Sequence, residues 1–77
     1  MTTTTLQPTT IGKYLVSPLT RRLDDGLYQS SVSIRSGQGR AMHDRVLRFT
    51  QPFMTPLEAL RYAAAQGREW VSDTLAR

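Results

Sequence analysis

The chain has 77 residues and no cysteine, and its ten basic residues outweigh six acidic ones to give a formal net charge of +4. This length allows one small domain, and without cysteine neither a disulfide nor a thiolate metal site can reinforce the core, which leaves homodimerisation open as a further support. The N-terminal segment lacks the basic region and the apolar stretch of a signal peptide, and no run of about 18–20 apolar residues could span a bilayer. We therefore expect a cytoplasmic protein with no membrane partner.

Residues 1–11 are rich in threonine and contain only three apolar side chains, Met1, Leu6 and Ile11. So little apolar surface does not repay the entropy lost when a segment is ordered. We expect a disordered tail over residues 1–11 and a single domain over residues 12–77.

A first strand is predicted from Tyr14 to Leu23, followed by a turn at Asp24-Asp25-Gly26, where glycine can adopt the positive φ of hairpin turns. Pro18 lies within this strand and cannot donate a ladder hydrogen bond. The strand is therefore expected at an edge of the sheet or broken by a bulge.

Two further strands are predicted by alternation. Leu27–Arg35 places Tyr28, Ser30, Val32 and Ile34 on one face and Gln29, Ser31, Ser33 and Arg35 on the other. After a polar loop over Ser36–Arg40, the run Met42–Phe49 places Leu47 and Phe49 on one face and Asp44, Val46 and Arg48 on the other. His43 and Arg45 share the face of Leu47, so we expect them at the end of the sheet, beyond its cover.

The sequence Thr55-Pro56-Leu57-Glu58 predicts a helix that begins at Pro56, since Thr55 can cap it and Glu58 can reach back to the cap. A period of 3.6 residues then extends almost to the C-terminus, with Ala64 and Gly67 facing the sheet; it comprises Leu57, Leu60, Ala64, Gly67, Val71 and Leu75. Alternatively, Gly67 ends the helix and Arg68 begins a second short element. The order of elements predicts an α+β fold, a three-stranded antiparallel β-meander packed against one C-terminal α-helix (βββα).

Over residues 12–72 the chain resembles a group of short bacterial proteins of the Burkholderia type, to which no activity is assigned. The resemblance lies in five segments: residues 12–19, 25–28, 33–37, 43–49, and 63–67 followed by Trp70-Val71. It implies no function and carries over no site residue.

Catalytic and metal-binding groups are sparse. His43 is the only imidazole, and its neighbour Asp44 points to the opposite face of a strand, so the two cannot form a dyad. Asp24-Asp25-Gly26 fits a turn better than a calcium loop, and Gly37-Gln38-Gly39 fits a hairpin connection better than a phosphate-binding loop. We expect no enzyme, no catalytic residue, no metal, no cofactor and no small-molecule substrate.

Nine of the ten basic residues are arginine, the side chain suited to bidentate contacts with phosphate. Small hydroxyls and arginines are expected to line the exposed face of the sheet. The first hypothesis is therefore a basic module that binds nucleic acid through Arg22, Ser31, Ser33, Arg35, Arg40 and Arg48. The alternative is that this face is merely solvated or binds protein.

Most aromatic residues coincide with predicted core positions, and no two form an exposed pair for stacking bases. Tyr62 and Trp70 could instead lie on an exposed flank of the helix and form a homodimer contact. The second hypothesis is thus a protein–protein interaction or structural module that acts through its sheet edge, its helix or a homodimer interface.

Overall fold

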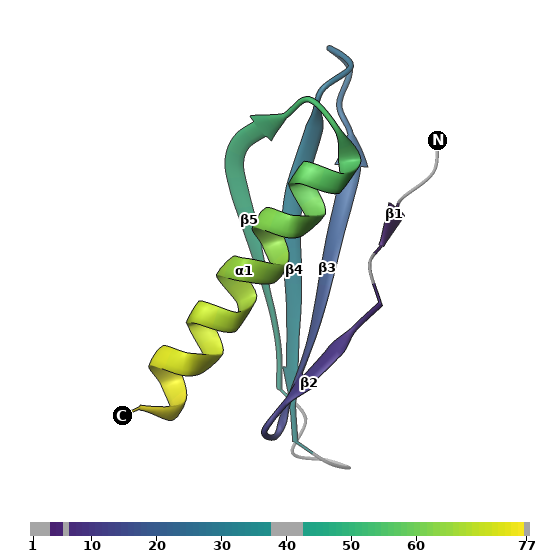
Figure 1. Ribbon diagram of the computed structural model, residues 1–77. Helices are drawn as coiled ribbons and strands as arrows, with labels where there is room; N and C mark the ends of the chain where they lie inside the picture. The colour runs from purple at the N-terminus through teal and green to yellow at the C-terminus, as the bar shows by residue number, and fades with distance from the viewer. Residues whose placement is uncertain (1–3, 6, 38–42, 77) are drawn as a thin grey trace.

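The computed structural model describes residues 4–5, 7–37 and 43–76. An antiparallel sheet carries one helix on one of its faces (Figure 1). The elements are β1 (Thr4–Thr5), β2 (Thr9–Ile11), β3 (Tyr14–Arg22), β4 (Tyr28–Ser36), β5 (His43–Phe53) and α1 (Pro56–Leu75). Since β1 and β2 both pair with β3 along the edge not occupied by β4, the sheet is four strands wide. The α+β architecture is confirmed, whereas the prediction of three strands is wrong.

The additional edge strand comes from residues expected in the N-terminal tail. Ile11 pairs with Tyr14 across the two-residue connection Gly12-Lys13, and Gly12 has a φ of +60°. A glycine with positive φ at the first connecting position is typical of type II′ hairpin turns. Ile11 also packs against the core. The strand forms in a segment poor in apolar residues because its β-branched threonines are ordered by backbone pairing, without burial of apolar side chains.

Pro18 lies in an interior strand and pairs with Val32 without a register shift. The irregularity lies in the neighbouring edge instead: β1 reaches Leu19 of β3 and β2 begins opposite Val16. The edge strand is thus interrupted opposite Pro18, where β3 has no N–H to donate. The expectation of an edge position or a bulge in β3 itself was wrong.

The predicted turn between β3 and β4 is confirmed. Gly26 has a φ of +85°, and its N–H donates to the Leu23 carbonyl at 3.0 Å. The Leu27 N–H donates to Asp25 Oδ1 at 3.0 Å, the local bond that favours aspartate in turns.

The core lies between α1 and the alternating inward residues of β3 and β4. Its buried apolar side chains are Tyr14, Val16, Val32, Ile34, Ala59, Leu60, Ala63 and Val71. Ser30 is also fully buried, and its hydroxyl donates to the Ala59 carbonyl at 2.7 Å, which joins β4 to the first turn of α1. This buried hydroxyl is therefore satisfied.

The helix begins as its cap predicts: the Glu58 N–H donates to Thr55 Oγ1 at 3.1 Å and Pro56 occupies the first turn. It continues through Gly67 to Leu75, so the alternative of a helix end at Gly67 is wrong. The buried stripe is turned relative to the prediction, with Ala63 rather than Ala64 at its centre. The terminal members Leu57 and Leu75 are exposed, because they lie on the flank of this turned stripe and not at its centre.

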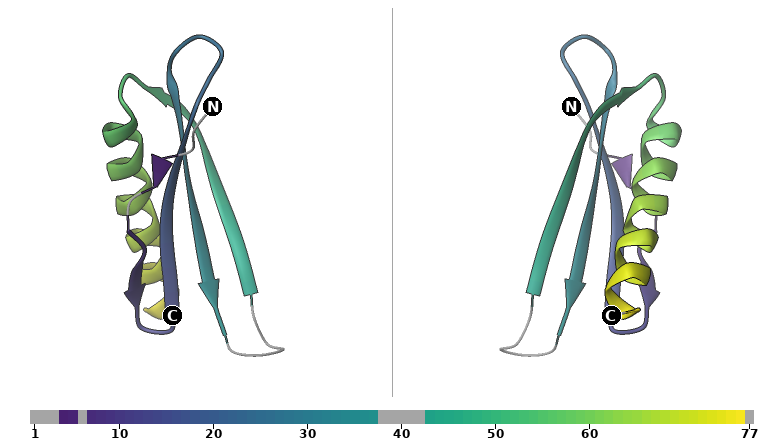
Figure 2. Two further views of the ribbon diagram at one scale, coloured as in Figure 1. Left: turned by 90° about the vertical axis from the view of Figure 1, so that its right-hand side faces the viewer. Right: turned by 90° about the vertical axis from the view of Figure 1, so that its left-hand side faces the viewer.

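The twist of the sheet brings α1 over β3 and β4 and leaves β5 farther from the helix than these two strands (Figure 2). Most side chains of β5 are accordingly exposed. Within the described part of the chain, the one helix is not apolar enough to cross a membrane.

Candidate nucleic-acid interface

We call the sheet face that points away from α1 the open face. The strand registers place on it alternate residues of three strands: Leu15, Ser17, Leu19 and Arg21 of β3; Gln29, Ser31, Ser33 and Arg35 of β4; and Asp44, Val46 and Arg48 of β5. Most of its small polar side chains lie on the central strand β4, and longer apolar and basic side chains lie on β3 and β5 to either side. The open face is therefore a shallow basic surface with a low centre.

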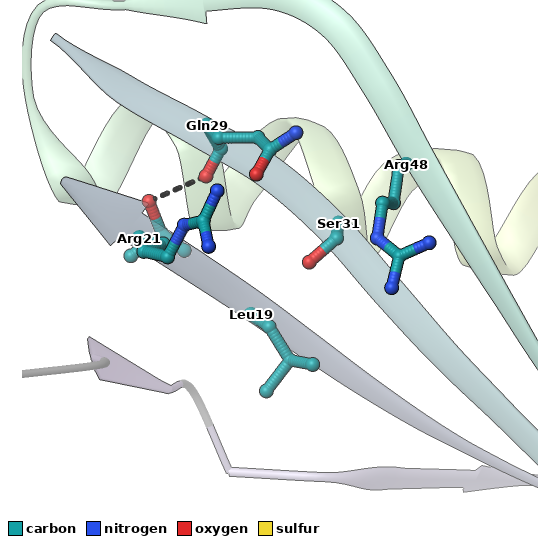
Figure 3. A pocket seen from close by; sticks show the side chains of 6 residues that line it. Leu19, Arg21, Gln29, Ser31 and Arg48 are labelled. Carbon is teal, nitrogen blue, oxygen red and sulfur yellow. Dashed lines mark hydrogen bonds between the residues drawn. The ribbon is translucent and has the colours of Figure 1, made fainter. Parts of the chain in front are cut away.

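A hollow of about 240 Å³ lies on this face between Arg21 and Arg48. Ser31 pairs with Leu19 on one side and with Arg48 on the other, and Gln29 pairs with Arg21. Figure 3 shows the short Ser31 side chain between the two arginines. Because serine reaches less far from the sheet than its neighbours, it forms the floor of the hollow.

Arg35 is paired with an acid. Its Nε lies 3.6 Å from Asp44 Oδ2, and the Ser33 hydroxyl donates to the other carboxylate oxygen at 3.2 Å. This is the only ion pair among the residues that the structure describes. Arg21 and Arg48 have no acidic partner within the same residues, so on the open face their guanidinium groups are the ones left available to a ligand.

The predicted contact residues divide into three sets. Ser31, Ser33, Arg35 and Arg48 lie on the open face as expected. Arg22 does not, because it shares the parity of the buried Thr20, and Arg21 takes the expected place. Arg40 lies outside the described residues.

The position of Arg21 could have been found from the sequence. Tyr14 and Val16 are apolar residues of even number in the same strand, and strict alternation assigns Arg22 to their face. The prediction of Arg22 on the open face did not take this parity into account.

Tyr62 and Trp70 do not stand on an exposed flank. Trp70 packs edge-on against Tyr14 with ring centroids 5.7 Å apart, and Tyr62 lies 5.1 Å from both Phe49 and Phe53. Both side chains are half-buried among aromatic rings of their own chain. A dimer contact through them stays a prediction.

A second hollow, of about 360 Å³, lies on the helix side where β5 diverges from α1. His43 and Arg45 line it and are exposed, but Arg45 does not lie beyond the helix cover, because it faces Trp70 of α1. The Arg45 guanidinium lies 5.6 Å from the Trp70 ring centre, and Lys13 Nζ lies 5.6 Å from that of Tyr14. These cations are already engaged with aromatic rings, which makes this hollow a weaker anion site than the open face.

His43 and Asp44 are consecutive in β5 and point to opposite faces, so the expected separation of this pair is confirmed. In the described ranges, no three His, Cys, Asp or Glu side chains are grouped as a metal site would require. Comparison of the chain with protein-family models, curated proteins and solved structures gives no match.

Proposed function

We propose that this protein is a small non-enzymatic module that binds nucleic acid through its open face. The observation that supports the proposal is the pair of arginines, Arg21 and Arg48, that flank the hollow above Ser31 without an acidic partner in the described chain. A guanidinium group presents its N–H donors in a planar fork that matches two phosphate oxygens. Two such groups across a short serine leave room for a sugar-phosphate backbone to approach the sheet.

An extended anion fits this surface better than a compact one. The hollow is shallow and continuous with the row of serines along β4, which includes Ser33. The net charge of +4 favours encounter with a polyanion over the whole surface. Since Asp44 offsets the charge of Arg35, the open face contributes two phosphate contacts, which predicts a slope of about −2 for log K against log salt concentration.

The test is binding of fluorescein-labelled duplex DNA and single-stranded RNA, measured by fluorescence anisotropy across a salt series. We expect a dissociation constant of about 10⁻⁴–10⁻⁶ M near physiological salt, as for non-specific phosphate binding. Replacing both Arg21 and Arg48 by glutamine should weaken binding at least about tenfold and remove most of the salt slope.

The matched control replaces Arg61 and Arg68 by glutamine, since both are exposed on α1 and the change in net charge is the same. This control should change affinity less than about threefold, because long-range charge alone is screened. Equal losses in the two double variants would reject the open face as the site. Absence of binding even at low salt would reject the function.

A further inference from the structure

The edge of the sheet formed by β5 has no neighbouring strand within the described chain. It is an 11-residue strand whose pairing with β4 is regular from Ser36↔His43 to Ser30↔Phe49, and its irregularity lies beyond that segment. The helix lies mainly over β3 and β4 and does not cover this edge (Figure 2). Natural proteins seldom leave so long and regular an edge uncovered.

We infer that β5 pairs with β5 of a second copy of this chain, antiparallel across a two-fold axis that passes through Val46. In this register each Val46 lies opposite the second copy's Val46. Each Asp44 then lies opposite the second copy's Arg48, and symmetry forms this pair twice. The sequence of β5 is thus complementary to itself in this register, which favours a second copy of the chain as the partner strand.

Charge and exposure favour this register over its neighbours. Val46 is 45% exposed in the single chain, and apolar pairing at the axis would remove it from water. Moving the axis to Arg45 would place two guanidinium groups directly opposite each other. Moving it to Leu47 would leave Asp44 without a basic partner. The axis at Val46 alone joins opposite charges and an apolar centre.

The same arrangement is compatible with the geometry of the single chain. A two-fold axis perpendicular to the sheet keeps both helices on one side and both open faces on the other. Asp44 would then lie between Arg35 of its own chain and the second copy's Arg48, and a carboxylate has acceptor sites for both. The joined open face keeps a net positive charge, and the dimer does not depend on the proposed binding of nucleic acid.

The first experiment uses the absence of cysteine from the chain. Opposite residues of an antiparallel pair have Cα atoms about 4.5–5.5 Å apart, within the range of a disulfide. A Val46→Cys variant should therefore form a disulfide-linked dimer rapidly under mild oxidation. Thr50→Cys is the matched control, because it is exposed on the same strand but lies eight residues from its copy across this register, roughly 27 Å away.

The second experiment reverses one charge at a time. In a dimer of the Asp44→Arg variant, arginine lies opposite arginine in both pairs, and in a dimer of the Arg48→Asp variant, aspartate lies opposite aspartate in both. Each variant alone should therefore dimerise at least about tenfold more weakly than the native chain. Mixed together, the two variants restore both opposite-charge pairs and should form a heterodimer. Sedimentation equilibrium follows the rise in mass from 8.7 kDa toward twice that value, and circular dichroism confirms that each variant is folded.

Three outcomes would overturn the inference. A native chain that stays monomeric at millimolar concentration excludes the dimer. Cross-linking of Val46→Cys no faster than that of Thr50→Cys excludes the axis. Charge-reversed variants that associate as well alone as when mixed exclude the register. Each experiment is carried out without nucleic acid, so its result neither supports nor contradicts the proposed function.

Discussion

Gly67 determines how closely α1 approaches the sheet. A Cβ atom at this position would lie 2.6 Å from Val16 Cγ1 and 3.0 Å from Val32 Cγ2. The first distance is shorter than real carbon contacts allow, so the core would have to shift to accept even one methyl group. The absence of a side chain in the middle of the helix is therefore a packing requirement, although glycine lowers helix propensity.

Gly67→Ala sets helix propensity against packing. The substitution gains about 1 kcal/mol of propensity but overpacks a rigid contact at a cost of about 1–3 kcal/mol or more. We expect the free energy of unfolding to fall by about 1–2 kcal/mol, measured by urea denaturation. Val16→Ala in the same chain should recover part of the loss through removal of the clashing methyl group. A net gain in stability for Gly67→Ala alone would show that the helix is not held this tightly.

Single positions also decide which face carries the charge. Arg21 and Arg22 are adjacent and chemically identical, yet strand parity places only Arg21 beside the hollow. Arg35 shows the converse, since it lies on the predicted face but has its charge offset by Asp44. Composition counts arginines equally, and only their neighbours distinguish the ones that can bind an anion.

At the scale of elements, burial differs from what hydropathy predicts. The N-terminal strand contributes to the core, whereas the apolar residues at the two ends of the helix are exposed. Ile11 is half-buried and packs against the core, although its segment is poor in apolar residues. Leu57 belongs to a regular apolar stripe but is 47% exposed. Burial here follows from which elements meet in space, not from the pattern within one element.

Two alanine substitutions compare the contribution of Ile11 to stability with that of Leu57. Ile11→Ala should lower the free energy of unfolding by about 1–2 kcal/mol, since it removes a partly buried branched side chain. Leu57→Ala should change it by less than about 0.5 kcal/mol, because little apolar surface is buried there and alanine keeps the helix propensity. Thermal unfolding followed by circular dichroism measures both. A silent Ile11→Ala would mean that β2 adds nothing to the stability of the sheet.

At the scale of the whole molecule, the proposed dimer and the proposed function share one surface. Two open faces joined across β5 would form a continuous sheet surface of net positive charge, on which Arg21 keeps no acidic partner among the described residues and Arg48 is shared with the second copy's Asp44. A nucleic acid long enough to contact both halves would be held at a higher effective concentration on the second half after contact with the first.

A covalently locked dimer makes this coupling measurable. The oxidised Val46→Cys dimer should bind a long DNA duplex at least about tenfold more tightly than the same protein after reduction at low concentration, where it is a monomer. Binding of a very short oligonucleotide should change little, because it reaches only one half. Equal affinities for the long duplex in both states would mean that the two open faces do not act together.

The sequence by itself determined the local features: the helix start at Thr55 and Pro56, the turn at Gly26, and the alternation of β4. Each depends on residues within a few positions of one another, through capping bonds, a positive φ or strand parity. Only the tertiary structure decided that residues 9–11 complete the sheet, that Ala63 and not Ala64 is buried beside Gly67, and that Asp44 offsets the charge of Arg35. These contacts join residues that are distant in the chain or lie on different strands. Their energies depend on the strand register and on the rotation of the helix, and both are set by packing of the core as a whole.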